Sequence, residues 1–419
     1  MDNYFDLHFH PVAKNHLAQY NDDMSYKRGN GELTKAIEMS KAFKDFTDET
    51  ILRTLESQCC IDYLEDGKVN LGVAAIAALE FGVASSKGFF SSVLKGNLTR
   101  PFSKHYFDVV SEGQVSYLNL FLREVEQYMA LKKSGAISVL NRKNIHKFNE
   151  KSLKLTFAIE GGHNLCMKKI GNALKYDEFK DIEKSAVLDP KTIASNNPAT
   201  VLEELVKKFR EKDLDVLYLT LTHLTHIPEQ HLATHAFATK ALKHPSFYPF
   251  GNGLSELGLE VIDKAYSLPV LIDIAHMSLK SRLDFYKYRK DKDYENIPII
   301  ASHVGVTGYS INDWKHNLDT IKCVNHVDQG IKTVKMYTKP KVAGYWGSNL
   351  KKEFTFNPNT INLMDEDIIE VVNSKGIIGV SLDISILGYE SGATPEIDSS
   401  EFLTTADFMT HFPYTGLQS

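Results

Sequence analysis

Short apolar runs alternate with amphipathic stretches along the chain from residue 153 onward. The runs have the length of strands and are rich in Val, Ile, Leu and Thr; they cover 155–162, 216–223, 269–276, 297–303 and 376–383. The stretches between them show the apolar spacing of helices, at 201–209, 258–266, 278–289 and 365–374. Strands that alternate with helices indicate βα units and a parallel sheet. Continuous apolar runs are typical of strands buried on both faces.

The first 150 residues are less regular. Residues 6–11 read Asp-Leu-His-Phe-His-Pro and predict a strand that ends before the proline. The apolar run 69–81 favours a buried strand leading into a helix, although periodicity alone does not separate the two. Further predictions are a loop over 15–31, the start of a helix near 47, a long loop or insertion over 85–115, and a helix over 117–131.

Together these patterns predict an α/β fold, a (β/α)8 TIM barrel formed by one domain over 1–419. Two large insertions are expected, at about 11–150 and 305–360. The run 376–383 counts as the seventh strand, and 401–419 has the character of an approach to an eighth. Either the chain is truncated at its C-terminus, or the barrel lacks its eighth strand in this chain.

Composition excludes several classes of function. The 419 residues are 43% hydrophobic and 24% charged, as in ordinary globular proteins. A net charge of −5 favours neither nucleic acid nor an anionic membrane as partner. No apolar run reaches the roughly 18–20 residues of a membrane span. The four cysteines form no Cys-x-x-Cys pair, and there is no room for a signal peptide before the first strand, so a cytoplasmic protein is expected. A leader removed before this numbering begins would also fit.

Ligand-type side chains stand at the ends of five predicted strands. They are His8 and His10, Glu160, His223, His276 and His303. In a parallel α/β barrel, the carboxyl ends of the strands form the face where active sites lie. Each residue alone has an ordinary interpretation, a satisfied core histidine or, for Glu160, a helix cap. Five strands that all end this way favour one shared site.

Histidine and glutamate together are the ligands of borderline divalent metals. The set suits two ions, zinc first, with manganese, iron or cobalt as alternatives. A carboxylate can bridge two ions and an imidazole cannot, so Glu160 is the natural bridge. The nucleophile would be a water whose pKa the metals bring down toward about 7. His231 and His235 have i, i+4 spacing but lack the Glu of a His-Glu-x-x-His site, and we interpret them as surface or loop residues.

Several segments resemble the signature of the membrane dipeptidases (renal dipeptidase, peptidase family M19). They are Ile-Glu-Gly-Gly at 159–162, Tyr-Leu-Thr-Leu-Thr-His at 218–223, Gly-Leu-Ser at 253–255 with Gly258, Leu-Ile-Asp-Ile-Ala-His-Met-Ser at 271–278, and Ser-His at 302–303. The resemblance covers about 153–305 and extends more loosely to His8 and to 365–383. It implies a metal-dependent hydrolase barrel of the amidohydrolase type with a two-zinc centre.

By this resemblance, His8 and His10 hold one metal, His276 and His303 hold the other, and Glu160 bridges them. His223 would face the substrate and stabilise the tetrahedral oxyanion. Glu160 and His223 are therefore the expected catalytic residues. The expected substrate-binding residues are His223, His316 and Asp383.

Three positions depart from the family pattern. The first strand carries His-x-His where the family has His-x-Asp, which is closer to the wider amidohydrolase pattern. His316, in Lys-His-Asn-Leu-Asp at 315–319, stands where the family has an arginine that grips the dipeptide carboxylate. The family's Gly-Ser-Asp-Phe-Asp-Gly-like motif on strand eight has no counterpart, and Asp383 lies one strand too early to replace it.

The favoured function is hydrolysis of a small amide, a dipeptide or related amino-acid derivative, by metal-activated water. Two alternatives stay open. One is another amidohydrolase-type reaction, such as lactone or cyclic amide hydrolysis. The other is a non-catalytic homologue that only binds metal. The expected partner is a small molecule, and the oligomeric state is left open, with a homodimer as one option.

Overall fold

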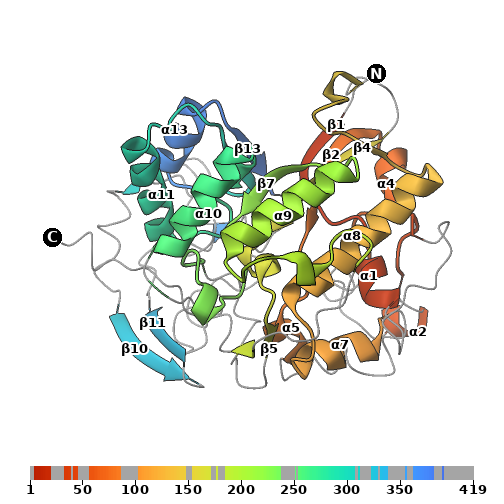
Figure 1. Cartoon of the computed structure of the whole chain (residues 1–419), viewed down its shortest axis with the longest axis horizontal. Coiled ribbons are helices and arrows are strands. Elements are labelled where there is room, and N and C mark those ends of the chain that lie inside the picture. The colour runs from red at the N-terminus through yellow and green to blue at the C-terminus, as the bar shows by residue number, and fades with distance from the viewer. Residues whose placement is uncertain are drawn as a thin grey trace. The chain divides into compact units, whose positions relative to one another are not determined.

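The computed structural model describes residues 4–19, 33–38, 41–45, 56–85, 102–147, 153–170, 176–177, 185–236, 251, 253–306, 310–311, 322–328, 331–337, 354–355, 362–381 and 389–390. The chain forms two compact units (Figure 1). The first unit comprises Met1–Glu160 and Asn164–Tyr218, and the second comprises Gly161–His163 and Leu219–Ser419. We call them the N-terminal and the C-terminal unit.

The N-terminal unit contains most of the long helices of the first half of the chain. Its strands are β1 (Tyr4–Phe9), β2 (Val69–Ile76), β3 (Ser138–Val139), β4 (Lys154–Glu160), β5 (Lys169–Ile170), β6 (Tyr176–Asp177) and the start of β7 (Val216–Thr220). Its α-helices are α1 (Ala13–Gln19), α2 (Lys41–Lys44), α4 (Ile61–Asp66), α5 (Phe81–Ser85), α7 (Lys104–Ser111), α8 (Tyr117–Ser134) and α9 (Pro198–Glu211). Short 3₁₀ turns are η3 (Ile145–Lys147), the second half of η4 (Gly162–Leu165) and η5 (Pro190–Thr192).

The C-terminal unit contains the remaining elements. Its strands are β8 (Leu271–Asp273), β9 (Ile299–Val304), β10 (Lys322–Asp328), β11 (Ile331–Tyr337), β12 (Phe354–Thr355), β13 (Ile377–Val380) and β14 (Tyr389–Glu390). Its helices are η6 (Pro228–Gln230), α10 (Glu256–Ser267), α11 (Leu279–Asp291) and α13 (Asp365–Asn373). No helix among the described residues has the length and hydropathy that a membrane span requires.

The main sheet has the strand order β1-β2-β4-β7-β8-β9-β13. The pairs β1/β2, β2/β4, β8/β9 and β9/β13 are parallel, and β3 adds to β4 in the same sense. Neighbours that follow one another along the chain and run parallel give the order of a (β/α) barrel. The predicted barrel fold is therefore confirmed with seven strands in sequence. Among the described residues, no pairing joins β13 to β1.

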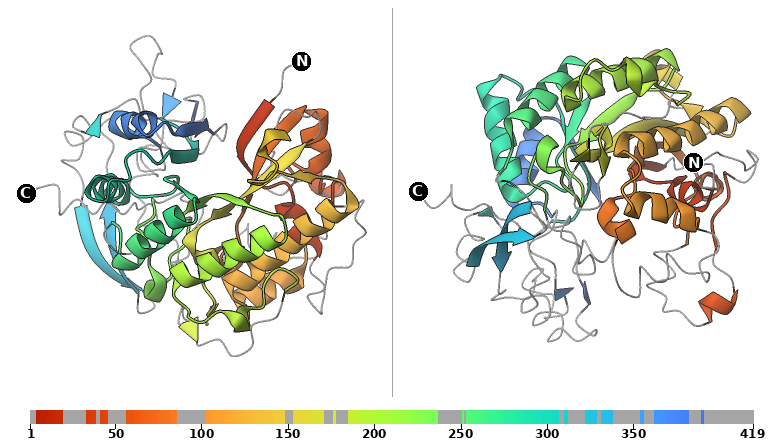
Figure 2. Two further views of the ribbon diagram at one scale, coloured as in Figure 1. Left: turned by 45° about the horizontal axis from the view of Figure 1, so that its top comes forward. Right: turned by 60° about the horizontal axis from the view of Figure 1, so that its bottom comes forward.

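Capping and aromatic packing explain the two long helices of the N-terminal unit. The Ser116 side chain accepts a hydrogen bond from the Asn119 N–H at the start of α8, and Gly135 ends that helix with φ of +80°. Asn197 caps α9, and Pro198 occupies its first turn. The rings of Phe121, Phe209, Phe157 and Tyr128 then pack α8 and α9 against β4. The ribbons of the two helices lie beside each other (Figure 2).

Three local predictions for the N-terminal half are corrected. The predicted loop 15–31 begins inside a helix, because α1 extends to Gln19. The predicted loop 85–115 contains α7, whose buried face includes Tyr106, Phe107 and Val110. A helix of eight residues is too short for its apolar spacing to stand out in the sequence. The interval 11–150 is not wholly an insertion, since it contributes β2 to the main sheet. The helix expected to begin near 47 lies outside the described residues.

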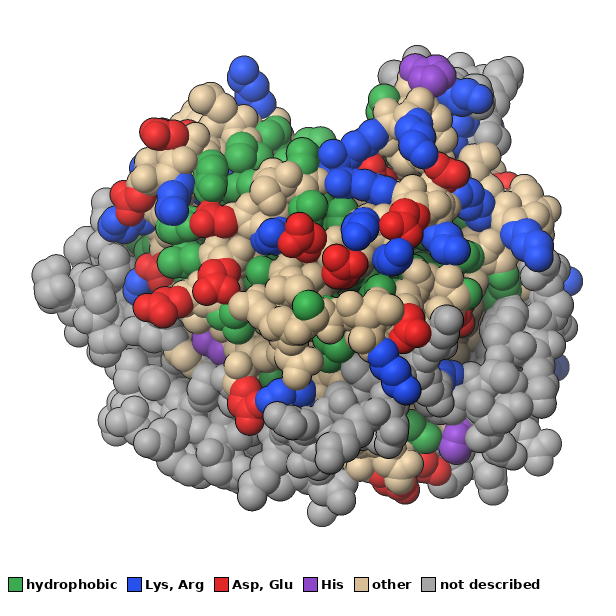
Figure 3. Space-filling model, viewed as in Figure 1, with side chains coloured by type: hydrophobic (Ala, Val, Ile, Leu, Met, Phe, Trp, Pro, Cys, Tyr) green, Lys and Arg blue, Asp and Glu red, His purple; other side chains and the backbone are tan. Residues whose placement is uncertain are grey.

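The second expected insertion, 305–360, contains an antiparallel pair, β10 and β11. The predicted helices at 258–266, 278–289 and 365–374 correspond to α10, α11 and α13, and 376–380 forms β13. The expected approach to an eighth strand at 401–419 lies outside the described residues. On the face of the molecule in Figure 3, acidic and basic side chains are interspersed.

A buried ion pair joins α11 to α13 in the C-terminal unit. The Arg282 Nε donates to Asp367 Oδ1 at 3.0 Å, and the two side chains are 2% and 0% exposed. Arg282 also donates to the carbonyl of Met277, and the Tyr286 hydroxyl donates to Asp367. These contacts compensate for the desolvation of both charges, so removal of one partner leaves a buried charge without compensation.

We therefore expect Arg282→Ala to lower the free energy of unfolding by about 3–5 kcal/mol, as measured by urea denaturation. Lys290→Ala is the matched control, because Lys290 also joins α11 to α13, through Glu370 at 3.1 Å, but is 55% exposed. Loss of this exposed ion pair should lower the free energy of unfolding by no more than about 1 kcal/mol. Equal effects of the two substitutions would contradict the role assigned to the buried pair.

Candidate metal centre

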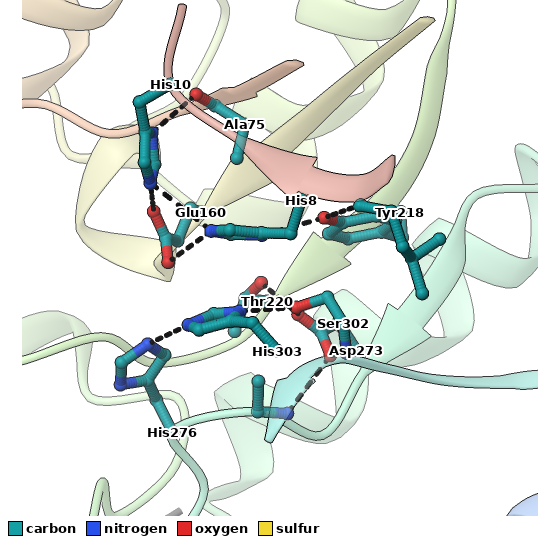
Figure 4. A network of polar contacts seen from close by, with 12 residues as sticks. His8, His10, Ala75, Glu160, Tyr218, Thr220, Asp273, His276, Ser302 and His303 are labelled. Carbon is teal, nitrogen blue, oxygen red and sulfur yellow. Dashed lines mark hydrogen bonds and ion pairs between the residues drawn. The ribbon is translucent and has the colours of Figure 1, made fainter. Parts of the chain in front are cut away.

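The alternation of β1 orients the first two histidines. Leu7 and Phe9 are each 6% exposed and pack into the core. Successive strand side chains point to opposite faces, so His8 and His10 project from the other side (Figure 4). β1 ends at Phe9, one residue before His10, and the chain turns at Pro11. The predicted geometry of this His-x-His strand is thus confirmed.

Both histidines meet Glu160, the last residue of β4. The Nε2 atom of His8 lies 3.2 Å from Glu160 Oε1, and the Nε2 atom of His10 lies 3.2 Å from Oε2. The two Nε2 atoms are themselves 3.2 Å apart. The Glu160 side chain is 2% exposed, whereas that of His10 is 37% exposed, so solvent and small molecules can reach the group from one side. We call these three residues the β1–β4 group.

The partners of the other ring nitrogens settle where the protons are. His10 Nδ1 lies 2.9 Å from the carbonyl of Ala75, which can only accept, so this Nδ1 carries hydrogen. His8 Nδ1 lies 2.9 Å from the Tyr218 hydroxyl. That hydroxyl donates its own hydrogen to the Leu7 carbonyl at 3.0 Å, so His8 Nδ1 is also the donor.

Each Nε2 of the β1–β4 group therefore presents a lone pair, and the two lone pairs converge beside a carboxylate. Three electron-rich groups within 3.2 Å of one another repel unless a cation lies among them. The cation is either an added proton or a metal ion, and two imidazoles with a carboxylate are a common ligand set for zinc. The donor set and its orientation fit a divalent metal.

A second carboxyl group, that of Glu124, is close enough to Glu160 to interact with it electrostatically. Glu124 of α8 is 1% exposed. Burial raises the pKa of Glu124 well above its ordinary value, and the negative charge of Glu160 raises it further. Both effects favour the protonated, neutral form of the Glu124 carboxyl group.

The glycine after Glu160 is required by the turn. Gly161 has φ of +94°, a conformation that side chains rarely adopt. A Cβ at this position would also lie 2.9 Å from the Cβ of His223. Its N–H donates to the carbonyl of Thr220 at 3.0 Å. The Glu-Gly-Gly sequence thus lets the chain leave β4 directly after the carboxylate.

In the C-terminal unit, His276 and His303 form a second group. Their Nε2 atoms are 2.8 Å apart (Figure 4). His303 lies on β9, as predicted, but the strands expected to carry His276 and His223 are shorter than predicted. β8 ends at Asp273 and β7 at Thr220, so both histidines follow in loops. The backbone of His276 has φ of +63°, which is incompatible with a strand.

The ring of His223 contacts this second group. Its ring packs edge-on against that of His276, with centroids 4.5 Å apart, and lies 6.1 Å from the ring of His163. His223 is only partly buried. Its ring therefore lies between two other imidazoles, those of His163 and His276.

The sequence patterns did not single out Asp273 as a site residue. Its carboxylate is fully buried and accepts four hydrogen bonds, from the N–H groups of Ala275 and Ser302 and from two hydroxyls. The hydroxyls are those of Thr220 and Ser302, at 2.7 and 2.6 Å. A carboxylate inside an apolar strand, three residues before His276, was the available signal.

His231 and His235, predicted as surface or loop residues, lie in a loop, and so does His226. His226 and His235 are 5% and 1% exposed. His235 Nδ1 lies 2.9 Å from the Ala236 carbonyl, and burial lowers the pKa of His231 to about 4. His316 and Asp383, the other predicted substrate-binding residues, lie outside the described residues.

Comparison with known proteins gives a distant likeness. No family model and no curated protein matches the sequence. Among solved structures, the chain is similar to a probable dipeptidase, PvdM, from Pseudomonas aeruginosa, with 12% identity, a TM-score of 0.38, and coverage of 77% of this chain and 53% of that one. The chain thus spans about half the length of that protein.

Two further solved structures are similar at the same identity, 12%. One is a metallo peptidase from Rhodobacter sphaeroides, liganded with a phosphinate mimic of the dipeptide L-Ala-D-Ala, with a TM-score of 0.42 and coverage of 90% of this chain and 73% of that one. The other is a dipeptidase described as a metallo peptidase of family M19, with a TM-score of 0.41 and coverage of 90% and 71%. At these scores the likeness assigns no activity to this chain.

Metal should stabilise the folded protein if the β1–β4 group binds it. Zinc added to chelator-treated protein at about 100 times its dissociation constant should raise the free energy of unfolding by about 2.7 kcal/mol, visible as a higher melting temperature. The increase should shrink in His10→Ala and persist in His146→Ala, because His146 is exposed on η3. If the melting temperature of the parent protein does not change when zinc is added, this metal centre is ruled out.

Proposed function

We propose that this protein is a metal-dependent hydrolase that cleaves a small amide, with a dipeptide or a related amino-acid derivative as substrate. The observation that carries the proposal is the β1–β4 group, in which two imidazole lone pairs converge beside one carboxylate. The group stands at the carboxyl ends of parallel strands, where barrel enzymes place their chemistry.

Two divalent ions, zinc first, would occupy the site. His8 and His10 would hold one ion, His276 and His303 the other, and Glu160 would bridge them. The convergent nitrogens of each histidine pair support the first two assignments. The bridging role of Glu160 rests on the resemblance of 159–162 to the dipeptidase signature and on the ability of a carboxylate to bind two cations.

Ions held there would supply Lewis acidity that activates a water and polarises the scissile carbonyl. The chain's own residues would do the rest. Glu160 would orient the attacking water through its hydrogen bonds. His223, partly exposed and edge-on to His276, would donate a hydrogen bond to the oxyanion that develops on the substrate carbonyl. Asp383 and His316 would contact the substrate.

A second candidate is hydrolysis of a lactone or a cyclic amide by the same site. The observation that favours it is the His-x-His strand, because imidazole in place of carboxylate makes the site one unit more positive than the dipeptidase pattern. His316 in place of arginine points the same way, since it weakens recognition of a free carboxylate. The two candidates share their metal chemistry and differ in the substrate that is turned over.

Glu160→Gln should abolish most of the activity. The substitution keeps the shape of the side chain and removes the charge that neutralises two cations. Changes to residues behind metal ligands typically cost about 10–100-fold, so this loss should exceed about 100-fold in kcat/KM for dipeptide hydrolysis. His146→Ala, at an exposed position away from the group, should leave kcat/KM unchanged. Similar rates for both variants would refute the role of Glu160.

His316→Arg should improve the binding of dipeptides. Arginine offers a planar pair of donors to a carboxylate, whereas a histidine offers one nitrogen and is mostly neutral at pH 7. A charge-assisted pair contributes about 1.5–3 kcal/mol, or roughly a ten- to hundredfold lower KM with little change in kcat. The C-terminal amide of the same dipeptide is the control and should not respond. If the parent already prefers the free acid strongly and the substitution changes nothing, another residue holds the carboxylate.

A further inference from the structure

The second histidine pair is supported by a chain of hydrogen bonds that ends on a buried anion. His303 Nδ1 lies 2.7 Å from the hydroxyl oxygen of Ser302. That hydroxyl donates its hydrogen to Asp273 Oδ2 at 2.6 Å. An oxygen that has given its only hydrogen to a carboxylate can only accept from the imidazole, so His303 Nδ1 carries hydrogen. The Nε2 of His303 then presents its lone pair toward His276 Nε2.

We propose that Ser302 and Asp273 are positioning residues for metal binding in the C-terminal unit. Ser302 fixes the tautomer of His303, and Asp273 fixes the direction of the Ser302 hydroxyl. This inference rests on the proposed metal-dependent function and adds to it which residues prepare the second metal position. A ligand histidine whose outer nitrogen has a fixed partner binds metal in one tautomer and one ring orientation.

The geometry around Asp273 supports a dedicated role. Its carboxylate is held by two N–H groups as well as two hydroxyls, so it cannot rotate to another partner. Ser302 is 2% exposed, and water does not replace its hydroxyl easily. A negative charge at the end of the chain of hydrogen bonds strengthens each donor–acceptor contact along it. The His303 imidazole is thereby a better electron donor to a cation at Nε2.

The corresponding arrangement in the N-terminal unit ends on a neutral group. The Tyr218 hydroxyl accepts from His8 Nδ1 and donates to the Leu7 carbonyl. Both units therefore use a hydroxyl as the acceptor for a histidine. The hydroxyl beside His303 donates to a carboxylate, whereas the hydroxyl beside His8 donates to a backbone carbonyl. The loss of Ser302 should accordingly affect one metal position and spare the other.

The test is a titration of chelator-treated protein with Co²⁺, followed by its absorption spectrum and by competition with a chromophoric chelator. The parent should bind two equivalents. In Ser302→Ala one equivalent should bind about 10–100-fold more weakly, while the other keeps its affinity. Ser302→Thr restores the hydroxyl and should recover most of the lost affinity.

Thr220→Ala is the matched control. Thr220 is buried and donates to the same Asp273 Oδ2 at 2.7 Å, and none of its described hydrogen bonds involves His303. Thr220→Ala removes a hydrogen bond to Asp273 comparable to the one lost in Ser302→Ala. It should therefore lower the free energy of unfolding by a similar amount without weakening Co²⁺ binding. Equal weakening in Thr220→Ala and Ser302→Ala, or unchanged binding in Ser302→Ala, would overturn the inference. Absence of Co²⁺ binding in the parent would instead refute the proposed function itself.

Discussion

The convergence of electron-rich atoms around Glu160 is the constraint on which the site depends. The repulsion between these atoms would disappear if His8 and His10 carried their hydrogens on Nε2, because each Nε2 would then donate to the Glu160 carboxylate. It does not, because the Ala75 carbonyl and the Tyr218 hydroxyl take the Nδ1 hydrogens of His10 and His8. The protein thus keeps two lone pairs directed at one another, at 3.2 Å. Such an arrangement is unfavourable until a cation occupies it.

The sheet supplies the positions for this arrangement. Parallel pairing of β1 with β2 and of β2 with β4 brings the carboxyl ends of these strands to one edge. Alternation along β1 directs both histidines to one face, and the glycines after Glu160 allow the chain to turn at once. Helices α8 and α9 hold β4 through the ring of Phe157.

The strands that carry the β1–β4 group could be predicted from the sequence because they depend on the periodicity of apolar residues. The two-residue alternation of β1 and the apolar β4 run identified His8, His10 and Glu160 as strand-end residues. The ends of β7 and β8 could not be predicted, because burial continues after the hydrogen-bonded strands stop: Leu221, Ile274 and Ala275 are 2%, 0% and 0% exposed. The apolar pattern therefore predicted β7 and β8 to be longer than they are, and His223 and His276 were assigned to them. Asp273 and Ser302 were missed as supporting residues because the hydrogen bond between these side chains of the neighbouring strands β8 and β9 leaves no trace in the apolar spacing.

The most direct test of the account is the zinc K-edge X-ray absorption spectrum of the protein after reconstitution with zinc and removal of excess metal. The account predicts bound zinc with nitrogen and oxygen ligands at about 2.0–2.2 Å and the outer scattering of coordinated imidazoles. A spectrum dominated by sulfur at about 2.3 Å, or retention of less than about a tenth of an equivalent of zinc, would contradict it.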